Sequence, residues 1–364
     1  MINGHAIGID ARMIEMSGIG TYIQHLMGVG IYDYALGKEE EIRRYDSEVK
    51  VIPYDAPIYS PKEQMEFPNK AVKSAGIDIM HFPHYNVPIS YRGKYVTTVH
   101  DLTHIVLPEL LGGKVKYMYA KFLMSQALRR ASHIFTVSEN SKKDIQEYFN
   151  IDRDKISITY DAIDEDFRVK KRSDIDYLYD KYGIARDKKY LLYVGNLKPH
   201  KNLSILLKAL RELNREEVFL LLVGKAFKSV DLNEQEKQMG IKDKVIHTGM
   251  VSKEELIDLY NLADLFVFPS LYEGFGIPPL EAMACGTPVI AADNSSIPEV
   301  CGDAAVYFDG KNVDELTWEI SKMLDSKEKQ MELIEHGMKR SKIFDWKRTE
   351  AEVTNRLYII TKNE

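Results

Sequence analysis

LFVFPSLYEGFGIPPLEAMACG, residues 265–286, is the stretch that decides the fold. Its apolar start at Leu265–Ser270 predicts a buried strand, and Leu280–Gly286 predicts a helix. Between them, Gly274 and Gly276 remove side chains at places where a ligand must approach the backbone. A strand, a glycine-rich loop and a helix in this order are typical of a site that binds a phosphate at a helix N-terminus.

Two carboxylates bracket this loop. Glu273 lies at its start, and Glu281 lies one turn into the helix, where Pro278 and Pro279 suit the first turn. Acceptors at these two places can bind the hydroxyls of a sugar and of a ribose. A tight strand-to-helix turn with two solvated glutamates fits the spacing equally well, so the spacing alone leaves both interpretations open.

Length and composition bound the class of protein. With 364 residues, the chain is long enough for two ordinary domains. Hydrophobic residues make up 45% and charged residues 29%, and the net charge of −6 argues against a nucleic-acid binder. The two cysteines, Cys285 and Cys301, exclude a disulfide framework and indicate a reducing compartment. We find no signal-peptide pattern and no apolar run near the ~20 residues of a membrane span, so we expect a cytoplasmic protein.

Short apolar runs alternate with longer helical patterns, which predicts parallel sheets covered by helices on both faces. In the first half the expected strands are Ala6–Asp10, Val49–Pro53, Ile79–Phe82, Tyr95–His100 and Ile134–Val137, with helices at Gly20–Leu36 and Val115–Ala131. In the second half they are Tyr190–Gly195, Val218–Val223, Val245–Thr248, Leu265–Phe268, Pro288–Ala291 and Ala305–Phe308, with helices at Leu203–Leu213, Lys253–Ala263, Leu280–Ala284 and Val313–Leu324. The predicted fold class is therefore α/β, with two doubly wound domains.

The charged segment Asp161–Gly183 shows no strand pattern, and we place the link between the two domains there. Two doubly wound domains joined in this way are expected to bind their ligand in a cleft between them, at the carboxyl ends of strands. A last helix is expected around Thr349–Thr361.

Further site candidates follow predicted strands. The first strand leads to SGIGTY, in which Gly18 and Gly20 predict a loop just ahead of a helix. This is not a dinucleotide fingerprint, because the third glycine is missing and the pair lies too far past the strand. His100 ends another strand, so its imidazole can bind a sugar hydroxyl or transfer a proton, or it can simply hydrogen-bond to local backbone.

Lys201 stands just before the helix predicted from Leu203, with Asn202 as a candidate N-cap. The helix dipole repels a lysine at this end, so the side chain is expected to have an anionic partner, for which a phosphate would serve. An exposed lysine on a polar loop is the alternative. Hydroxyls of Asn294–Val300 are expected near the same site, whereas Ser138 or Asn140 is expected only to cap its own helix.

Two charge patterns bear on metals and membranes. Three Asp-x-Asp pairs resemble those that hold a metal on a diphosphate, but they lie in charged connecting segments, and we expect no metal there. Residues 90–145 hold nine Lys or Arg against four Asp or Glu. Within them, Lys114–Arg130 interleaves bases with aromatic and aliphatic residues, which suits either an anionic membrane surface or an ordinary helix with snorkelling lysines.

In order, the motifs SGIGTY, TVHDL, VSENS, VGNLKPHKNL, FPSLYEGFGIPPLEAMACGTPVI and SSIPEVCGDAA closely resemble those of the family four retaining glycosyltransferases. The resemblance runs from about Gly8 to Phe308 and is most specific between Glu273 and Glu281. It implies the GT-B fold of two facing Rossmann-like domains with an interdomain cleft, here residues 1–168 with 345–364, and 169–344. It also implies a nucleotide-diphosphate sugar as donor, with no cofactor and no metal.

The resemblance implies a role for each matching residue. Catalytic roles fall to His100, Lys201 and Glu273, and donor binding falls to Gly18, Gly20, Asn196, Lys201, Phe275, Gly276, Ile277 and Glu281. His100 would approach the transferred sugar, Lys201 would bind the diphosphate, and Glu281 would take the ribose hydroxyls. Glu273 would hold the sugar and phosphate together with the backbone of the three residues from Phe275. The loop of Gly18 and Gly20 would lie near the diphosphate and the acceptor.

One departure concerns Asn196, since many relatives have an arginine there, which makes Lys198 or His200 a candidate for the second cation. The predicted function is transfer of a hexose, with retention, from a GDP- or UDP-linked sugar to a saccharide or lipid-linked hydroxyl. The SGIGTY loop resembles that of bacterial O-antigen and exopolysaccharide enzymes, which favours GDP-mannose as the donor of mannose. It also favours an enzyme that acts at the inner face of the membrane and contacts it through Lys114–Arg130. A sugar-nucleotide 2-epimerase and a non-catalytic subunit with the GT-B fold are the alternatives.

Overall fold

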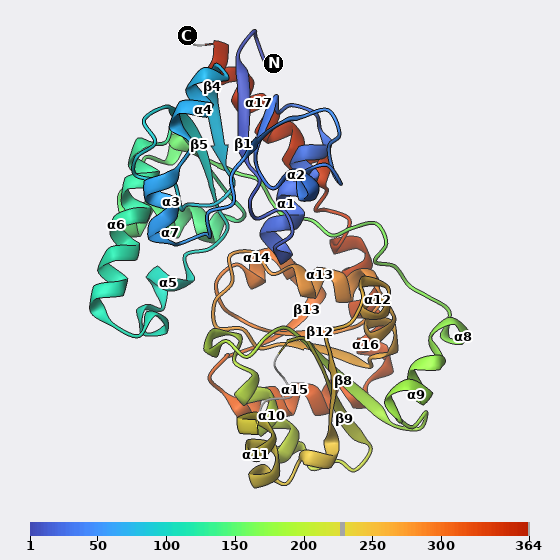
Figure 1. Cartoon of the computed structure of the whole chain (residues 1–364). Coiled ribbons are helices and arrows are strands. Elements are labelled where there is room, and N and C mark those ends of the chain that lie inside the picture. Colours follow the sequence, from blue (N-terminus) through green and yellow to red (C-terminus); the bar gives the residue numbers. More distant parts are fainter. Residues whose placement is uncertain (226–229, 363–364) are drawn as a thin grey trace. The chain divides into compact units, whose positions relative to one another are not determined.

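The computed structural model describes residues 1–225 and 230–362. The chain divides into two compact units, Met1–Asp161 with Asp345–Glu364, and Ala162–Phe344 (Figure 1). The boundary that we predicted at residue 168 therefore differs, because residues 162–168 belong with the second unit. Each unit contains one parallel β-sheet with helices around it.

The sheet of the first unit has, within the described residues, seven strands in the order β3-β2-β1-β4-β5-β6-β7. Neighbouring strands are parallel throughout. The strands are β1 Ala6–Asp10, β2 Tyr34–Gly37, β3 Lys50–Pro53, β4 Ile77–Phe82, β5 Lys94–Val99, β6 His133–Thr136 and β7 Ile156–Ile158. The helices are α1 Ser17–Gly28, α2 Glu39–Ile42, α3 Pro61–Glu66, α4 Asn69–Ser74, α5 Thr103–Val106, η1 Pro108–Leu111, α6 Lys114–Arg130, α7 Glu139–Phe149, η2 Arg153–Lys155 and α17 Trp346–Lys362.

The second unit repeats the plan with the order β10-β9-β8-β11-β12-β13. Its strands are β8 Lys189–Val194, β9 Val218–Val223, β10 Val245–Gly249, β11 Leu265–Phe268, β12 Val289–Ala292 and β13 Ala305–Phe308. Its helices are α8 Arg172–Ile175, α9 Tyr177–Tyr182, η3 Pro199–Lys201, α10 Leu203–Leu213, α11 Val230–Met239, η4 Lys242–Lys244, α12 Lys253–Leu262, α13 Ile277–Ala284, α14 Ile297–Cys301, η5 Gly302–Ala304, α15 Val313–Asp325 and α16 Lys327–Arg340.

Both sheets are doubly wound, so the α/β prediction is confirmed. In each sheet the chain starts in the middle, extends to one edge and then returns to build the other side. The order therefore reverses between β1 and β4 in the first sheet and between β8 and β11 in the second. In sheets of this kind, ligands bind outside the carboxyl ends of the strands at this switch point.

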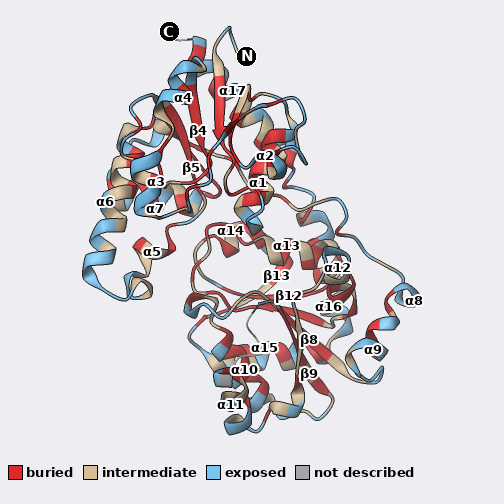
Figure 2. Ribbon diagram, in the orientation of Figure 1, coloured by how far each residue is buried: buried red, intermediate tan, exposed pale blue. Residues whose placement is uncertain are grey.

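The sequence pattern finds most elements, because central strands are apolar on both faces. Every strand predicted above is present, with its ends shifted by at most two residues. The helix predicted at Leu203–Leu213 is α10, whose leucines at positions 203, 206, 207 and 210 are all buried, as the i, i+3, i+4, i+7 spacing requires. Figure 2 shows the sheets buried and the outer helix faces exposed.

The helix predicted at Gly20–Leu36 is present as α1, Ser17–Gly28, but its predicted end is wrong. Helix α1 ends at Gly28, and Gly30, at φ 71°, turns the chain into strand β2 at Tyr34–Gly37. Strand β2 is itself buried, so the apolar residues continue past the end of the helix. Hydrophobic periodicity therefore could not separate the strand from the helix. Strand β7 also escaped prediction, because a strand of three residues is too short to show a pattern. No helix within the described residues is long and apolar enough to cross a membrane.

Candidate functional site

Lys201 and Glu273 meet at the switch point of the second sheet. Lys201 ends η3 after strand β8, and Glu273 lies between strand β11 and helix α13. The Nζ atom of Lys201 lies 2.7 Å from Oε1 and 2.9 Å from Oε2 of Glu273. The two side chains are 21% and 13% exposed, so the pair is shielded but still reachable by a ligand. Two residues that the sequence singled out 72 positions apart are thus brought together.

The predicted anionic partner of Lys201 is, in this structure, the Glu273 carboxylate. An ammonium group has three N–H donors, and Glu273 accepts two of them. The remaining N–H is available to a phosphate oxygen. The Nζ atom also lies over the Phe268 ring, 5.9 Å from its centroid, which is within the range of a cation–π attraction.

The loop that carries Glu273 is held by two serines. The backbone N–H of Glu273 donates to Ser295 Oγ at 2.9 Å. Ser296 Oγ lies 3.0 Å from the carbonyl oxygen of Glu273 and 2.7 Å from that of Phe275, so its single proton is shared between them. The hydroxyls expected from this segment are therefore near the site, but they bind the loop backbone. Their contribution is to fix the position of Glu273.

The first turn of α13 presents its backbone to the same region. Gly276, at φ 109°, is the N-cap, and a side chain there would be strained. Pro278 and Pro279 have no N–H, which leaves the N–H of Ile277 as the donor at the first helical position. A helix start of this kind attracts a negatively charged oxygen.

Glu281 lies in the same helix, and Tyr260 on α12 donates a hydrogen bond to its Oε2 at 2.8 Å. Burial raises the pKa of Glu281 to about 7, and the hydrogen bond from Tyr260 opposes that rise. Within the described chain, Oε1 accepts no hydrogen bond, so one carboxylate oxygen is left for a ligand. Sequence analysis missed Tyr260, because a tyrosine on the apolar face of a helix shows no sign of a polar partner.

Asn196 does not join the pair. Its Oδ1 accepts from the backbone N–H of Lys198 at 3.1 Å, which closes the turn after β8. Of the two candidates for a second cation, Lys198 is exposed, whereas His200 is buried with its carbonyl oxygen bonded to Leu271 N–H. Asn202 is the N-cap residue of α10, as predicted, but its side chain makes no cap hydrogen bond. Its Nδ2 donates instead to the carbonyl oxygens of residues 269 and 310, which ties together the loops after β11 and β13.

In the first unit, the prediction that Gly18 and Gly20 form a loop just ahead of a helix is wrong. Helix α1 begins at Ser17, so both glycines lie within its first turn. A Cβ atom on Gly20 would lie 2.6 Å from the carbonyl oxygen of Ile14, whereas one on Gly18 would meet nothing within 4 Å. Gly20 is required by the loop that packs against the helix, and no ligand is needed to explain it.

His100 follows strand β5, as predicted. Its Nε2 lies 3.0 Å from the carbonyl oxygen of Pro83, which can only accept, so Nε2 carries the proton. The ring of Tyr22 packs against the imidazole at 4.9 Å with an edge-to-face geometry. Burial lowers the pKa of His100 to about 4, so the imidazole is neutral at pH 7, with Nδ1 as its acceptor atom. Local backbone therefore satisfies one nitrogen, and the other can accept from a hydroxyl.

The switch point of the first sheet holds a buried charged network that sequence analysis missed. The Arg12 guanidinium lies 2.6 Å from Asp10 and 2.7 Å from Glu63, and all three side chains are nearly inaccessible. Asn86 donates to Glu63, and His84 Nε2 lies 3.6 Å from Asp10. Burial opposes ionisation of Asp10, but the adjacent Arg12 charge holds the pKa of Asp10 well below its usual range.

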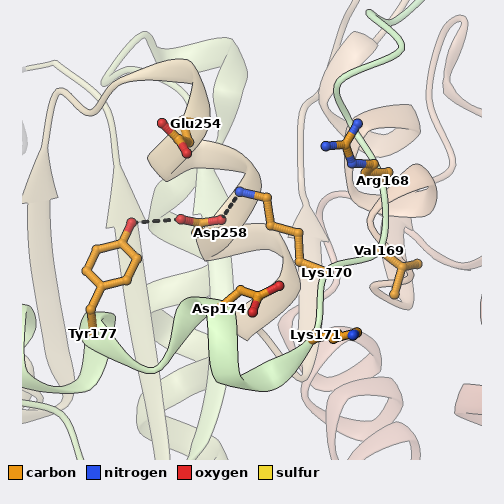
Figure 3. A pocket seen from close by; sticks show the side chains of 8 residues that line it. All are labelled: Arg168, Val169, Lys170, Lys171, Asp174, Tyr177, Glu254 and Asp258. Carbon is orange, nitrogen blue, oxygen red and sulfur yellow. Dashed lines mark hydrogen bonds and ion pairs between the residues drawn. The ribbon is translucent and has the colours of Figure 1, made fainter.

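The described residues contain no group of three or more His, Cys, Asp or Glu side chains placed to hold a metal ion. A hollow of about 600 Å³ lies beside α8 and α12, and Figure 3 shows its lining. The lining residues are Arg168, Val169, Lys170, Lys171, Asp174, Tyr177, Glu254 and Asp258. Lys170 and Tyr177 both bind the Asp258 carboxylate, so this hollow is a polar junction of the linker segment with α12. No residue that we predicted for the site lines it.

Two doubly wound parallel-sheet units in one chain define the GT-B class of fold. Solved structures of low sequence identity share it over the whole chain. Sucrose-phosphate synthase from Thermosynechococcus elongatus is 16% identical, with a TM-score of 0.82 over 99% of this chain and 100% of that one. HepE of Anabaena, solved with UDP-glucose, is 20% identical, with a TM-score of 0.78 over 97% and 99%.

Sequence comparison assigns the family. Residues 174–340 match the model described as glycosyl transferases group 1, and residues 32–167 match that of Glycosyltransferase Family 4. O-antigen chain mannosyltransferase B of Escherichia coli is 33% identical over 281 residues, which cover 76% of this chain and 73% of that protein. The chain therefore belongs to the group 1 glycosyltransferases.

Other relatives are matched over a smaller share of their length. O-antigen chain mannosyltransferase RfbU of Salmonella typhimurium is 33% identical over 65% of this chain and 61% of the relative. The serotype-specific mannosyltransferase WbdA of Escherichia coli is 32% identical over 73% of this chain, but the aligned part spans only 33% of that longer protein.

Proposed function

We propose that this glycosyltransferase moves mannose from GDP-mannose to a hydroxyl of a saccharide or lipid-linked acceptor, in the synthesis of a cell-surface polysaccharide. The observation that carries the proposal is the Lys201–Glu273 pair at the β8/β11 switch point, beside the first turn of α13. The names of the relatives, which include O-antigen mannosyltransferases, support the choice of mannose. Because such an acceptor is lipid-linked, we place the enzyme in the cytoplasm, at the inner face of the membrane.

The main chemical problem is the negative charge that develops on the leaving diphosphate. Donors that are fixed in advance stabilise such charge better than mobile water does. We assign this task to the ammonium group of Lys201 and the backbone N–H groups at Gly276 and Ile277. Lys201 supplies positive charge at this point, so the proposed mechanism includes no metal ion and no cofactor.

The two glutamates bind the rest of the donor. Oε1 of Glu281 accepts from a ribose hydroxyl, while Tyr260 holds Oε2. Glu273, with the backbone of Phe275, holds the sugar and its phosphate. In the first unit, Nδ1 of His100 accepts from a hydroxyl of the transferred sugar. Gly18, which is exposed in the first turn of α1, is the acceptor-side candidate, whereas Gly20 acts only through packing.

The transfer proceeds with retention of configuration on one face of the sugar. The bond between the anomeric carbon and the phosphate oxygen breaks, and the acceptor oxygen bonds to the same face of that carbon. The departing phosphate oxygen takes the proton of the acceptor hydroxyl, so charge and atoms balance. The predicted residues include no carboxylate that we assign as a nucleophile, which favours this route over a double displacement.

Calorimetric titration with GDP-mannose, UDP-glucose and ADP-glucose tests the proposal. We expect GDP-mannose to bind with the same affinity with and without EDTA. A lysine that donates to a phosphate contributes about 1.5–3 kcal/mol, so Lys201→Met should weaken GDP-mannose binding by at least about tenfold. Lys208→Met is the matched control, because Lys208 is exposed on the adjacent helix α10.

Product analysis separates the remaining alternatives. Mannose transferred to an acceptor with the α configuration of the donor supports the proposal, and an inverted product contradicts the retaining step. A sugar epimerised without any acceptor would identify an epimerase. A protein that binds none of the three donors would be a non-catalytic subunit.

A further inference from the structure

Tyr59 is a large side chain held in an unfavourable backbone conformation at the surface of the first unit. Its φ is 64°, in the left-handed region that bulky residues seldom adopt, and 58% of the residue is exposed. Glycine or asparagine would occupy this position at a lower cost, so the course of the backbone does not explain a tyrosine here. Strain of this kind is common at sites that bind a ligand.

The backbone of Tyr59 is fixed by the buried Glu63 carboxylate. The N–H of Tyr59 donates to Glu63 Oε2 at 3.0 Å, and Asn86 Nδ2 donates to the same oxygen. Arg12 binds the other oxygen of this carboxylate, Oε1, at 2.7 Å. One fully buried carboxylate therefore holds both the loop before α3 and the loop after β4.

Each of these two loops carries a tyrosine, and the two rings lie together. Tyr85 stands one residue before Asn86, and its ring centroid lies 6.1 Å from that of Tyr59, with the ring planes tilted by 42°. We call Tyr59 and Tyr85 the tyrosine pair. Because the planes are tilted, the Tyr85 ring does not stack over the Tyr59 ring, and the exposure of Tyr59 leaves a face of its ring open to a ligand.

A carboxylate lies close to the tyrosine pair. Burial raises the pKa of Tyr85 well above its usual value, and the neighbouring Tyr59 and Asp101 side chains add to that rise. Asp101 is exposed, so its carboxylate can reach a ligand. The tyrosine pair thus offers an open aromatic face with a hydrogen-bond acceptor nearby.

The tyrosine pair also belongs to the same end of the first sheet as His100. Strands β4 and β5 are parallel neighbours, and Tyr85 and His100 follow their carboxyl ends. His100 Nε2 donates to the carbonyl oxygen of Pro83, which lies two residues before Tyr85. A molecule held by the tyrosine pair would therefore lie at the edge of the sheet where we assign a hydroxyl of the transferred sugar to His100.

We propose that the tyrosine pair and Asp101 bind a pyranose ring of the acceptor. The apolar face of the sugar would stack on the open face of Tyr59, and Asp101 would accept a hydrogen bond from one of the sugar hydroxyls. A lipid phosphate fits less well, because the Asp101 carboxylate would repel it. This inference rests on the proposed function and narrows it, since the acceptor would be an existing saccharide and not a lipid phosphate without sugar.

Acceptor kinetics of the whole chain with GDP-mannose test the proposal. The probes are octyl glycosides of mannose, glucose, galactose and N-acetylglucosamine, which carry one sugar ring, and a polyprenyl phosphate, which carries none. We expect transfer to at least one glycoside and none to the polyprenyl phosphate. In Tyr59→Asn, which keeps the left-handed backbone but loses the ring, the KM for that glycoside should rise roughly tenfold or more. Tyr59→Phe keeps the aromatic face and should leave that KM nearly unchanged.

The matched control is Tyr358→Ala, which removes another exposed tyrosine of the same unit, on α17, and should leave the acceptor KM unchanged. Urea unfolding checks that each variant is folded, and Tyr59→Asn should be at least as stable as the unmodified protein, because it relieves the strain at residue 59.

Calorimetric titration with GDP-mannose distinguishes failure of this inference from failure of the proposed function. If the protein binds the donor, an acceptor KM that is unchanged in Tyr59→Asn overturns the subsite. Transfer to the polyprenyl phosphate alone, or to none of the probes, overturns it as well. If the unmodified protein binds no nucleotide sugar, the proposed transfer reaction itself is contradicted.

Discussion

Replacing Tyr260 by Phe should move the pH dependence of donor binding. The Tyr260 hydroxyl donates to Glu281 Oε2 at 2.8 Å and favours the ionised carboxylate. Burial acts in the opposite direction and raises the pKa of Glu281 to about 7. The substitution removes one oxygen atom from a fully buried ring and leaves the packing of α12 on α13 otherwise intact.

The size of the effect follows from the lost hydrogen bond. A hydrogen bond to a charged group contributes about 1.5–3 kcal/mol, and about 1.4 kcal/mol corresponds to one pKa unit. We therefore expect the pKa of Glu281 to rise by about one to two units in Tyr260→Phe. At pH 7 the ionised fraction would fall from about one half to about one tenth or less, and the affinity for the donor would fall about fivefold or more.

The assay is calorimetric titration of a nucleotide sugar at pH values between about 6 and 8.5. A nucleotide sugar is the right ligand, because its bridging diphosphate keeps the same charge over this range, whereas a free nucleoside diphosphate does not. We expect affinity to rise with pH in both proteins, with the rise displaced to higher pH in Tyr260→Phe. The control is Tyr190→Phe, which removes another buried hydroxyl of the same unit, one that donates to the carbonyl oxygen of Ala185.

Three results would refute this reasoning. If the profiles of Tyr260→Phe and the unmodified protein coincide, the hydrogen bond does not control Glu281, or Glu281 does not touch the donor. If Tyr190→Phe shifts the profile as much as Tyr260→Phe does, the effect comes from general loosening of the unit. A uniform loss of affinity at every pH would mean that Tyr260 acts through packing alone.

Three further predictions concern stability, measured by urea unfolding. Arg12→Met should lower the free energy of unfolding by about 3–5 kcal/mol, since it leaves Asp10 and Glu63 buried without their cation, and a loss below about 1 kcal/mol would contradict this. Burial raises the pKa of Asp161 to about 8, so between about pH 4 and 8 the folded state holds a proton that the unfolded state has lost, and the contribution of Asp161 to the free energy of unfolding should fall as pH rises through this range. Asp161→Asn lacks this contribution, so its stability at pH 8 relative to pH 4 should exceed that of the unmodified protein by as much as a few kcal/mol, and an unchanged pH dependence would disprove the assignment. Gly20→Ala should destabilise by about 1–3 kcal/mol through its contact with Ile14, whereas Gly18→Ala should be neutral or slightly stabilising.

Patterns in the sequence predict those elements whose structure is determined by their own residues, and they miss elements whose structure depends on neighbouring strands. Strand β11 and helix α10 were found because their apolar spacing is set by their own residues. Strand β2 was missed because the residues that make it a strand are its neighbours on β1 and β3, which no window of sequence displays.

The residues of the candidate site also fall into those that the local sequence predicts and those that depend on the fold. Lys201 and Glu273 could each be named from the turn that carries it, since a glycine-rich turn after a strand has a recognisable composition. Their pairing required the neighbouring placement of β8 and β11, which is a property of the sheet. The partners that hold the site, Ser296 and Tyr260, were not identified as such, because nothing in their local sequence distinguishes a tethering hydroxyl from any other.

The two switch points differ in a way that bears on where the donor binds. In the first unit the side chains after β1 and β4 are committed to one another, with Asp10, Arg12 and His84 all buried. A ligand there would have to break a buried ion pair, which is costly because one charge would be left without its partner. In the second unit, Lys201 and Glu273 remain partly exposed and keep one N–H donor uncommitted. The buried network therefore favours the second unit over the first as the place where the charged part of the proposed donor binds.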